Sequence, residues 1–159
     1  MKPILVGLDG SELAERGLVM AANLAEGLDA TIIAARVVPP RLSSDAYDPD
    51  LVRRVEEADE KDAASYLAET EARLRGDRVR AETRLLHGDA ARALIAAARQ
   101  DECSLIVVTS HGMSGLGFHA FGSVAQKVLE HAPCAVVVVP CSDADLVKQF
   151  EEQTAAARQ

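Results

Sequence analysis

Short apolar runs alternate with longer amphipathic segments, and this alternation restricts the possible folds more than any other feature of the chain. The apolar runs, such as residues 4–8, have no polar face, as expected of strands covered on both sides. Between them, apolar residues recur every three or four positions, as on one face of a helix. We therefore expect an α/β domain with a five-stranded parallel sheet, right-handed crossovers and helices on both faces. The predicted strands are residues 4–8, 31–38, 79–85, 105–109 and 135–139, and the predicted helices are about 14–28, 50–74, 90–100 and 122–131.

The third strand and the second helix each have one polar side. In the strand, apolar residues alternate with Arg80, Glu82 and Arg84, so we expect it at an edge of the sheet. The charges of the second helix are interpreted as a solvated face and not a binding patch, and Gly76 is expected to end this helix. The predicted inward residues are Ala14, Leu18, Ala21, Ala25 and Leu28 in the first helix, and Leu51, Val55, Ala58, Tyr66, Leu67, Thr70 and Leu74 in the second.

Composition argues against several classes of protein. The 159 residues fit one domain, and a formal net charge of -8 argues against nucleic-acid binding, although backbone N–H groups can still hold a nucleotide's phosphates. The apolar surroundings of Cys103 and Cys134 predict buried thiols in a reducing compartment. No apolar stretch approaches the roughly 20 residues of a membrane span, and the first apolar run meets Asp9 too soon for a signal peptide. We expect a cytoplasmic protein with no nucleic-acid or membrane partner.

The fifth predicted strand consists of one alanine and four valines, Ala135–Val139. An uncovered strand of this kind at the far edge of the sheet would promote aggregation. Pairing with the same strand of a second chain would cover it, so we predict a homodimer through this strand. The alternative is burial under the C-terminal tail, residues 141–159, which has one amphipathic stretch and is expected to be a frayed helix at most. A monomer mass in light scattering at micromolar concentration would contradict the dimer.

A candidate ligand site follows from the rule that open parallel sheets bind ligands beyond the carboxyl ends of their strands, where the winding reverses. Residues 9–11, residues 37–38 and a long loop, residues 110–121, are expected to meet there. The loop is glycine-rich and enters a helix at Gly122-Ser123, where free N–H groups and the helix dipole favour an anion. It contains none of the P-loop, dinucleotide or nucleophile-elbow motifs, so a hydrolase is unsupported.

The loop does fit another pattern. It resembles that of the universal stress protein family, whose nucleotide-binding members carry G-x2-G-x9-G-[ST] at this place; here Gly112 is followed after nine residues by Gly122-Ser123. The resemblance covers about residues 1–140 as one domain, and it implies a flavodoxin-like α/β sandwich with strand order 3-2-1-4-5 that dimerises through its last strand. The segments that carry it are residues 4–11, 87–90, 122–128 and 131–140.

The resemblance also implies a site for ATP or another adenine nucleotide. Asp9 would lie near the ribose or near a Mg2+ ion bound to the phosphates, and the backbone of Val37 would face the adenine. The motif's first glycine is Thr109 here, whose side chain would either crowd the ligand or offer it a hydroxyl group. The ribose and phosphates would be wrapped by Ser110, His111 and Gly112, and the phosphate tail would be held by Gly122, Ser123 and Val124.

These features favour a nucleotide-dependent stress-response or regulatory switch that acts on an unknown protein partner. No complete catalytic set is visible, so we assign no catalytic residue and expect slow ATP hydrolysis at most. The alternative is a nucleotide-free interaction module of the same fold. A third interpretation is an enzyme of adenylyl or phosphoryl transfer, but the sequence shows no Lys or Arg clamp of the kind that such chemistry needs. Asp9 as a mere helix N-cap and His111 as a catalytic base are further alternatives, and the His and Cys spacings match no common zinc pattern.

Overall fold

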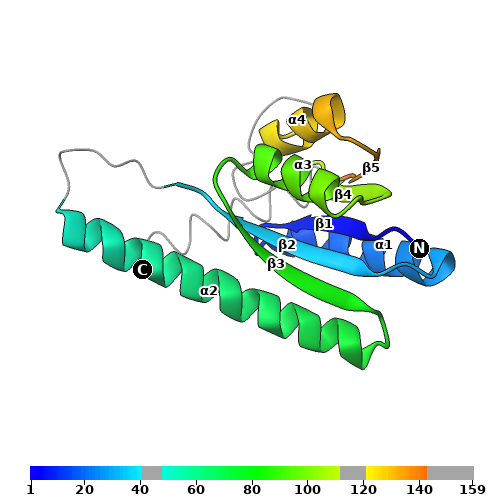
Figure 1. Ribbon diagram of the computed structural model, residues 1–159, viewed down its shortest axis with the longest axis horizontal. Helices are drawn as coiled ribbons and strands as arrows, with labels where there is room; N and C mark the ends of the chain where they lie inside the picture. The colour runs from blue at the N-terminus through cyan, green and yellow to red at the C-terminus, as the bar shows by residue number, and fades with distance from the viewer. Residues whose placement is uncertain (41–47, 112–120, 143–159) are drawn as a thin grey trace.

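The computed structural model describes residues 1–40, 48–111 and 121–142, which form one parallel five-stranded sheet flanked by helices (Figure 1). The strand order is β3-β2-β1-β4-β5, as expected, with β3 and β5 at the two edges. Gly112, most of the glycine-rich loop and residues 143–159 of the predicted tail lie outside the described residues. The strands are β1 (Ile4–Leu8), β2 (Ile32–Val38), β3 (Ala81–His87), β4 (Leu105–Thr109) and β5 (Ala135–Val139).

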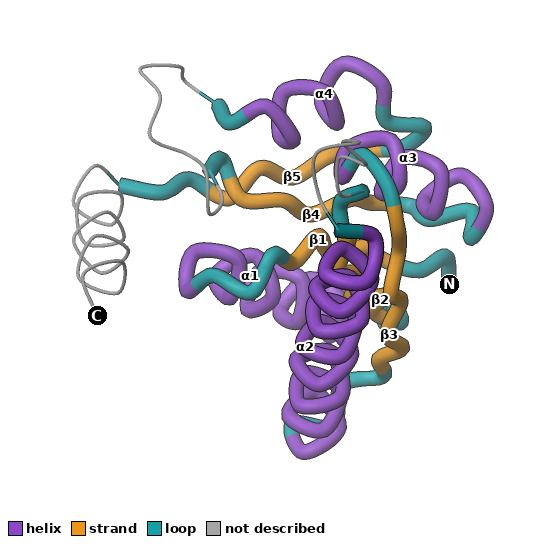
Figure 2. Tube along the Cα trace, turned by 90° about the vertical axis from the view of Figure 1, so that its left-hand side faces the viewer, coloured by secondary structure: helices purple, strands orange, loops and turns teal. Residues whose placement is uncertain are grey.

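The helices form two layers, one on each side of the sheet. Figures 1 and 2 show α1 and α2 together on one face and α3 and α4 on the other. The side chains between each layer and the sheet are aliphatic; Val6 and Val107 are fully buried on the α1 face, and Leu5 and Ile106 on the α3 face. The predicted two-faced parallel sheet is therefore confirmed. The helices are α1 (Glu12–Leu28), α2 (Pro49–Gly76), α3 (Ala90–Gln100) and α4 (Ser123–His131).

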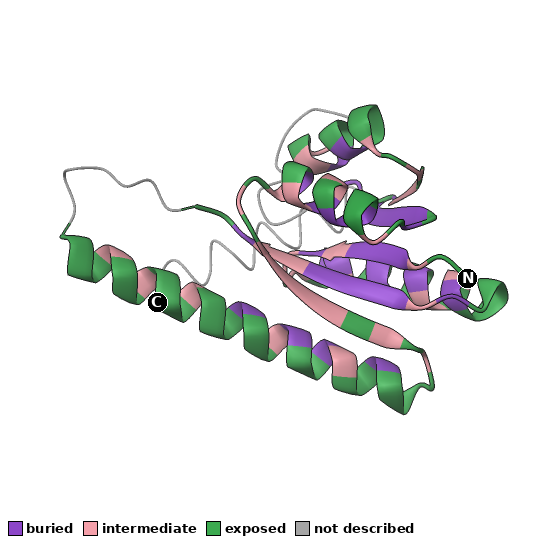
Figure 3. Cartoon of the chain, in the orientation of Figure 1, coloured by how far each residue is buried: buried purple, intermediate pink, exposed green. Residues whose placement is uncertain are grey.

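Helix α2 corrects two expectations about buried residues. Its 28 residues span about 42 Å, far more than a strand of the sheet, so its N-terminal half extends past the strand ends (Figure 3). Leu51 in that half is 53% exposed and Ala58 is exposed as well, although the helical spacing predicted both as inward. Leu28, in the last turn of α1, is also exposed. The buried residues of α2 are Ala63, Leu67, Thr70 and Leu74.

The second crossover, β2-α2-β3, differs from the prediction in the turn that follows its helix. Helix α2 ends at Gly76, as predicted, but the positive φ of the turn is at Arg78, at 61°, and not at the glycine. The turn is therefore longer, and β3 begins at Ala81 and not at Val79. The half-buried pattern of β3 agrees with its predicted place at an edge.

Two of the three cysteines have surroundings that disfavour thiolate formation. Cys103 is buried, as predicted, and burial raises the pKa of its thiol to about 11. Cys134 was also predicted to be buried but is only half-buried; burial raises the pKa of its thiol as well. Both thiols are therefore expected to be unreactive at neutral pH. None of the helices that the structure describes is both long and apolar enough to cross a membrane.

Candidate functional site

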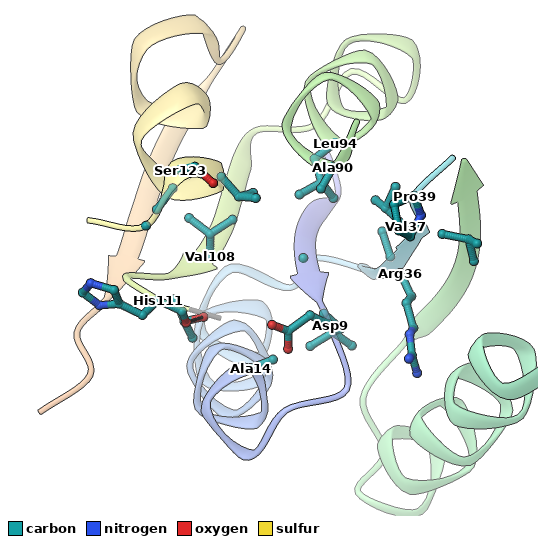
Figure 4. A pocket seen from close by; sticks show the side chains of 18 of the residues that line it. Asp9, Ala14, Arg36, Val37, Pro39, Ala90, Leu94, Val108, His111 and Ser123 are labelled. Atoms are coloured by element: carbon teal, nitrogen blue, oxygen red, sulfur yellow. Dashed lines mark hydrogen bonds between the residues drawn. The ribbon is translucent and has the colours of Figure 1, made fainter. Parts of the chain in front are cut away.

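A cleft of about 800 Å³ lies over the carboxyl ends of β1, β2 and β4 (Figure 4). Its position corresponds to the reversal of winding between β1 and β4, which are neighbours in the sheet although not in the chain. A cleft of this size is large enough for a nucleotide. The predicted site residues that lie within the described ranges all line it: Asp9, Val37, Thr109, Ser110, His111, Gly122, Ser123 and Val124.

The turn between β1 and α1 holds Asp9 at the floor of the cleft. Its Oδ1 accepts hydrogen bonds from the backbone N–H of Ser11 at 2.9 Å and from the Ser11 hydroxyl at 2.6 Å. The Ser11 Oγ in turn accepts from the N–H of Ala14 at 3.2 Å, so Ser11 is the N-cap of α1 and the interpretation of Asp9 as an N-cap is wrong. Gly10 has φ +84°, a conformation that favours glycine and lets the chain turn sharply here.

The N-terminus of α4 forms the other end of the cleft. Within the described helices, α1, α2 and α3 are capped by the side chains of Ser11, Asp48 and Asp89, whereas the N-cap of α4 is Gly122 and provides no side-chain hydrogen bond. The first N–H groups of a helix have no intrahelical acceptor. The α4 end can therefore direct backbone donors and the positive end of its dipole toward an anion beside Ser123.

Ser110 connects this helix end to the last strand. It is only 4% exposed, and its carbonyl oxygen accepts a hydrogen bond from Gly122 N–H at 2.6 Å. Its own N–H donates to Val139 O at 2.8 Å, and its hydroxyl oxygen accepts from the N–H of Cys141 at 2.9 Å. The hydroxyl also lies 3.2 Å from Nδ1 of the buried His111. Ser110 thus joins β4, α4 and the segment after β5, a positioning role that the sequence did not indicate.

Three charged residues of the cleft were missed. Arg36, at the end of β2, lines it, as do Asp59 and Asp62 of α2. Arg36 was hidden because it lies within an otherwise apolar strand, and only strand pairing places it beside the β1 turn. The two aspartates correct the interpretation of the α2 charges as a solvated face alone. The cleft therefore does contain an arginine, although sequence reasoning found no cationic clamp.

The universal stress protein family matches residues 1–140 of this chain. The chain belongs to this family. A universal stress protein of Thermus aquaticus is 33% identical over 141 residues, which cover 87% of this chain and 98% of that one. A family member from Burkholderia pseudomallei has a solved structure with TM-score 0.69 and 32% identity, covering 88% of this chain and 96% of that one. A universal stress protein solved in complex with cAMP has TM-score 0.68 and 26% identity, covering 89% of this chain and 98% of that one.

Thr109 is where this universal stress protein departs from the nucleotide motif of its family. Its hydroxyl donates to His111 O at 2.8 Å. Its methyl carbon Cγ2 lies 3.4 Å from the position that a Cβ on Gly17 would occupy, so the side chain packs against α1. The threonine is accommodated by an internal hydrogen bond and by a helix glycine.

Replacing Ser110 by alanine should lower the free energy of unfolding by about 1–3 kcal/mol, because buried donors and acceptors that face the hydroxyl would be left without it. Urea unfolding followed by circular dichroism measures this change. Ser104→Ala is the matched control: the Ser104 hydroxyl is exposed and bonds only at 3.4 Å, so its loss should cost less than about 0.5 kcal/mol. Equal stability losses in the two variants would refute a stabilising role of the Ser110 hydroxyl; the backbone bonds of Ser110 to Gly122 and Val139 remain in both variants.

The described residues contain no group of three or more His, Cys, Asp or Glu side chains that could hold a metal ion by themselves. A Mg2+ ion at Asp9 would therefore depend on phosphate oxygens of a bound nucleotide for most of its ligands. Asp9, the carboxylate that the sequence predicted for this role, lines the cleft, as do Asp59 and Asp62.

Proposed function

We propose that this universal stress protein binds an adenine nucleotide, with ATP as the first candidate, and acts as a nucleotide-dependent regulatory switch. The observation that carries the proposal is the helix end without a side-chain cap, at Gly122, which borders a cleft of about 800 Å³. The cAMP complex of a family member with 26% identity supports an adenine nucleotide as the ligand class.

In the proposed orientation, the phosphates lie at the N-terminus of α4 against Gly122, Ser123 and Val124. The ribose lies near Asp9, and the base lies beside the backbone of Val37. This orientation uses the backbone donors of α4 for the phosphate charge, which agrees with a chain whose net charge is -8. Mg2+, where present, would bridge Asp9 and the phosphate oxygens.

The proposed role is regulatory because the chemistry for rapid turnover is not assembled among the described residues. The Ser110 and His111 side chains are adjacent, but both are buried, and the Ser110 hydroxyl is engaged by Cys141 N–H. Any hydrolysis of ATP should therefore be slow, and occupancy of the cleft would be read by a protein partner. Rapid multiple turnover of ATP by the isolated protein would refute the switch.

The direct test is to denature the purified protein and chromatograph the nucleotides that it releases. Stoichiometric release of ATP or another adenine nucleotide would support the proposal. A protein purified empty would be titrated with Mg-ATP by calorimetry. If it then bound neither ATP, ADP nor AMP, a nucleotide-free interaction module would replace the switch.

Replacing Thr109 by glycine restores the family motif and tests the same alternative. Since the Thr109 side chain packs on α1 and bonds to His111 O, we expect ATP affinity to change by less than about 3-fold, well under 1 kcal/mol. Thermal stability should fall, because glycine in a strand loses packing and gains conformational entropy on unfolding. Calorimetry and thermal melting measure the two effects. A large gain in ATP affinity would show that threonine obstructs the ligand.

We also propose that the protein forms a homodimer through β5. The strand is at an edge of the sheet, and Val136, Val137 and Val138 are only half-buried in the single chain. An apolar strand edge of this kind favours pairing with another strand. A second copy of β5 would cover both the valines and the unpaired backbone groups.

A further inference from the structure

We infer that the cleft is suited to an adenosine nucleotide that carries a second phosphate on its ribose, at the 2′ or 3′ position, and that Arg36 receives this phosphate. The inference rests on the proposed function and specifies its ligand class. It comes from the surroundings of the Arg36 guanidinium, a cationic group at the end of the cleft away from α4.

Strand pairing places Arg36 beside the residue proposed to contact the ribose. Arg36 is opposite Leu8, the last residue of β1, in the β1–β2 register, and Asp9 directly follows Leu8 in the chain. Both Arg36 and Asp9 line the cleft, and Figure 4 shows the Arg36 side chain extending from the end of β2 while Ser123 lies on the far side. The cleft therefore has a cation near Asp9 and a helix N-terminus at its opposite end.

The guanidinium lies between the Tyr66 ring and the β1–α1 turn. Its carbon lies 5.1 Å from the centroid of the Tyr66 ring, in cation–π contact. On the β1–α1 turn, the position of a Cβ on Gly10 would be 3.1–3.3 Å from the guanidinium atoms Nη1, Cζ and Nη2, so the group is close to the backbone there. The Tyr66 ring and this turn therefore compete with a base for the faces of the guanidinium, and the N–H groups at its edge are the donors offered to a ligand.

Those edge donors have no other partner in the part of the chain that the structure describes: Arg36 forms no hydrogen bond or ion pair with residues 1–40, 48–111 or 121–142. Arg73, further along α2, differs in this respect: its Nη2 is 2.8 Å from Glu15 Oε2. A guanidinium that is held in place without a carboxylate retains its full capacity to bind an acceptor.

The Tyr66 ring that supports Arg36 is itself fixed. Its hydroxyl donates to Glu15 Oε1 at 2.5 Å, and burial together with this glutamate raises the pKa of Tyr66, so the ring stays neutral at physiological pH. Because Glu15 also pairs with Arg73, the ring is anchored from α1 and α2 at once. The guanidinium is thereby preorganised, which lowers the entropic cost of binding a ligand.

The acceptor that matches a fixed pair of parallel N–H donors is a phosphate or carboxylate. The base is a poor match, because the N6/N7 edge of adenine offers one donor and one acceptor. An arginine beside a ribose-binding acid is the arrangement that accommodates a phosphate on the ribose. Asp9, Asp59 and Asp62 line the same cleft, so without Arg36 this end would repel a phosphate.

Three isomers test the inference: ADP, adenosine 2′,5′-bisphosphate and adenosine 3′,5′-bisphosphate contain the same atoms and differ in where the second phosphate is attached. By isothermal titration calorimetry, the wild-type protein should bind one of the two ribose-phosphorylated isomers at least about 10-fold more tightly than ADP. Which isomer is preferred reports the ribose position that faces Arg36.

Two variants then assign the preference. Arg36→Met keeps an apolar side chain against Tyr66 and should abolish the preference. Arg36→Lys keeps the positive charge but lacks the planar pair of N–H donors, and it should retain only part of the preference. Arg80→Met is the control, since Arg80 pairs with Asp29 at the other end of the sheet. ADP binding as tight as that of both isomers, or a preference unchanged in Arg36→Met, would overturn the inference while leaving the proposed function standing. A protein that bound none of the three isomers and no AMP would overturn both this inference and the proposed function.

Discussion

Replacing Ser123 by aspartate should weaken ATP binding by at least about 10-fold, or about 1.4 kcal/mol, without harming the fold. Ser123 is the first residue of α4, next to the Gly122 N-cap, and it is exposed to the cleft. A carboxylate there would occupy the proposed phosphate position and repel the phosphate charge at short range. The same carboxylate interacts favourably with the helix dipole, so the helix itself should gain about 0.3–1 kcal/mol.

The opposite signs of these two effects make the prediction specific. Calorimetry with ATP and with adenosine measures binding, and thermal melting measures stability. Adenosine affinity should be nearly unchanged in Ser123→Asp, because adenosine carries no phosphate to be repelled. Ser123→Asn is the matched control, with similar size and no charge. If the aspartate and asparagine variants bound ATP equally well, the phosphates would not lie at the α4 end.

Replacing Val137 by lysine should convert the proposed dimer into a monomer. In the single chain Val137 is half-buried at the sheet edge, so a lysine stem can lie along the α1 face and place its ammonium group in water. At a β5–β5 interface the same ammonium groups would be brought close together and partly desolvated, which is costly for unpaired charges. We expect the mass from light scattering at micromolar concentration to fall by half.

The control for this experiment is Leu51→Lys. Leu51 is an exposed apolar residue of α2, and Figure 2 shows α2 well away from β5. The Leu51→Lys variant should have the same mass in light scattering as the wild-type protein, whatever its effect on solubility. A monomer mass for the wild-type protein would refute the β5 dimer directly. A Val137→Lys protein that kept the wild-type dimer mass would place the interface elsewhere on the molecule.

Local patterns in the sequence were sufficient to predict the position of most strands of the sheet. The structure has β1, β4, β5 and α3 within the residue bounds that were expected, because continuous apolar runs and strict helical spacing report burial directly. The strand order agrees with the family resemblance. The glycine-serine pair at residues 122–123 likewise indicated the start of α4, since a helix start depends on a few adjacent residues.

Local patterns failed where burial depended on distant parts of the chain. The apolar spacing of α2 continues through Leu51, but whether that face is covered depends on where the strands end. The shift of β3 to Ala81 has a similar origin, because its start is set by pairing with Ile32 of β2. A periodic pattern predicts a helix face, and only the tertiary structure decides how much sheet lies beneath it.

The composition of the cleft shows the same division. The sequence alone predicted the fold class and the edge of the sheet that carries the ligand site. It also predicted the residues of the β1 turn and of the α4 N-terminus that line the cleft. These predictions follow from local segments and from the general rule for ligand sites in parallel sheets. Only the tertiary structure revealed that Ser110 anchors α4 to β5, and that Arg36 lies between Gly10 and Tyr66. Those contacts join residues far apart in the chain, and their energies depend on three-dimensional proximity that no local pattern encodes.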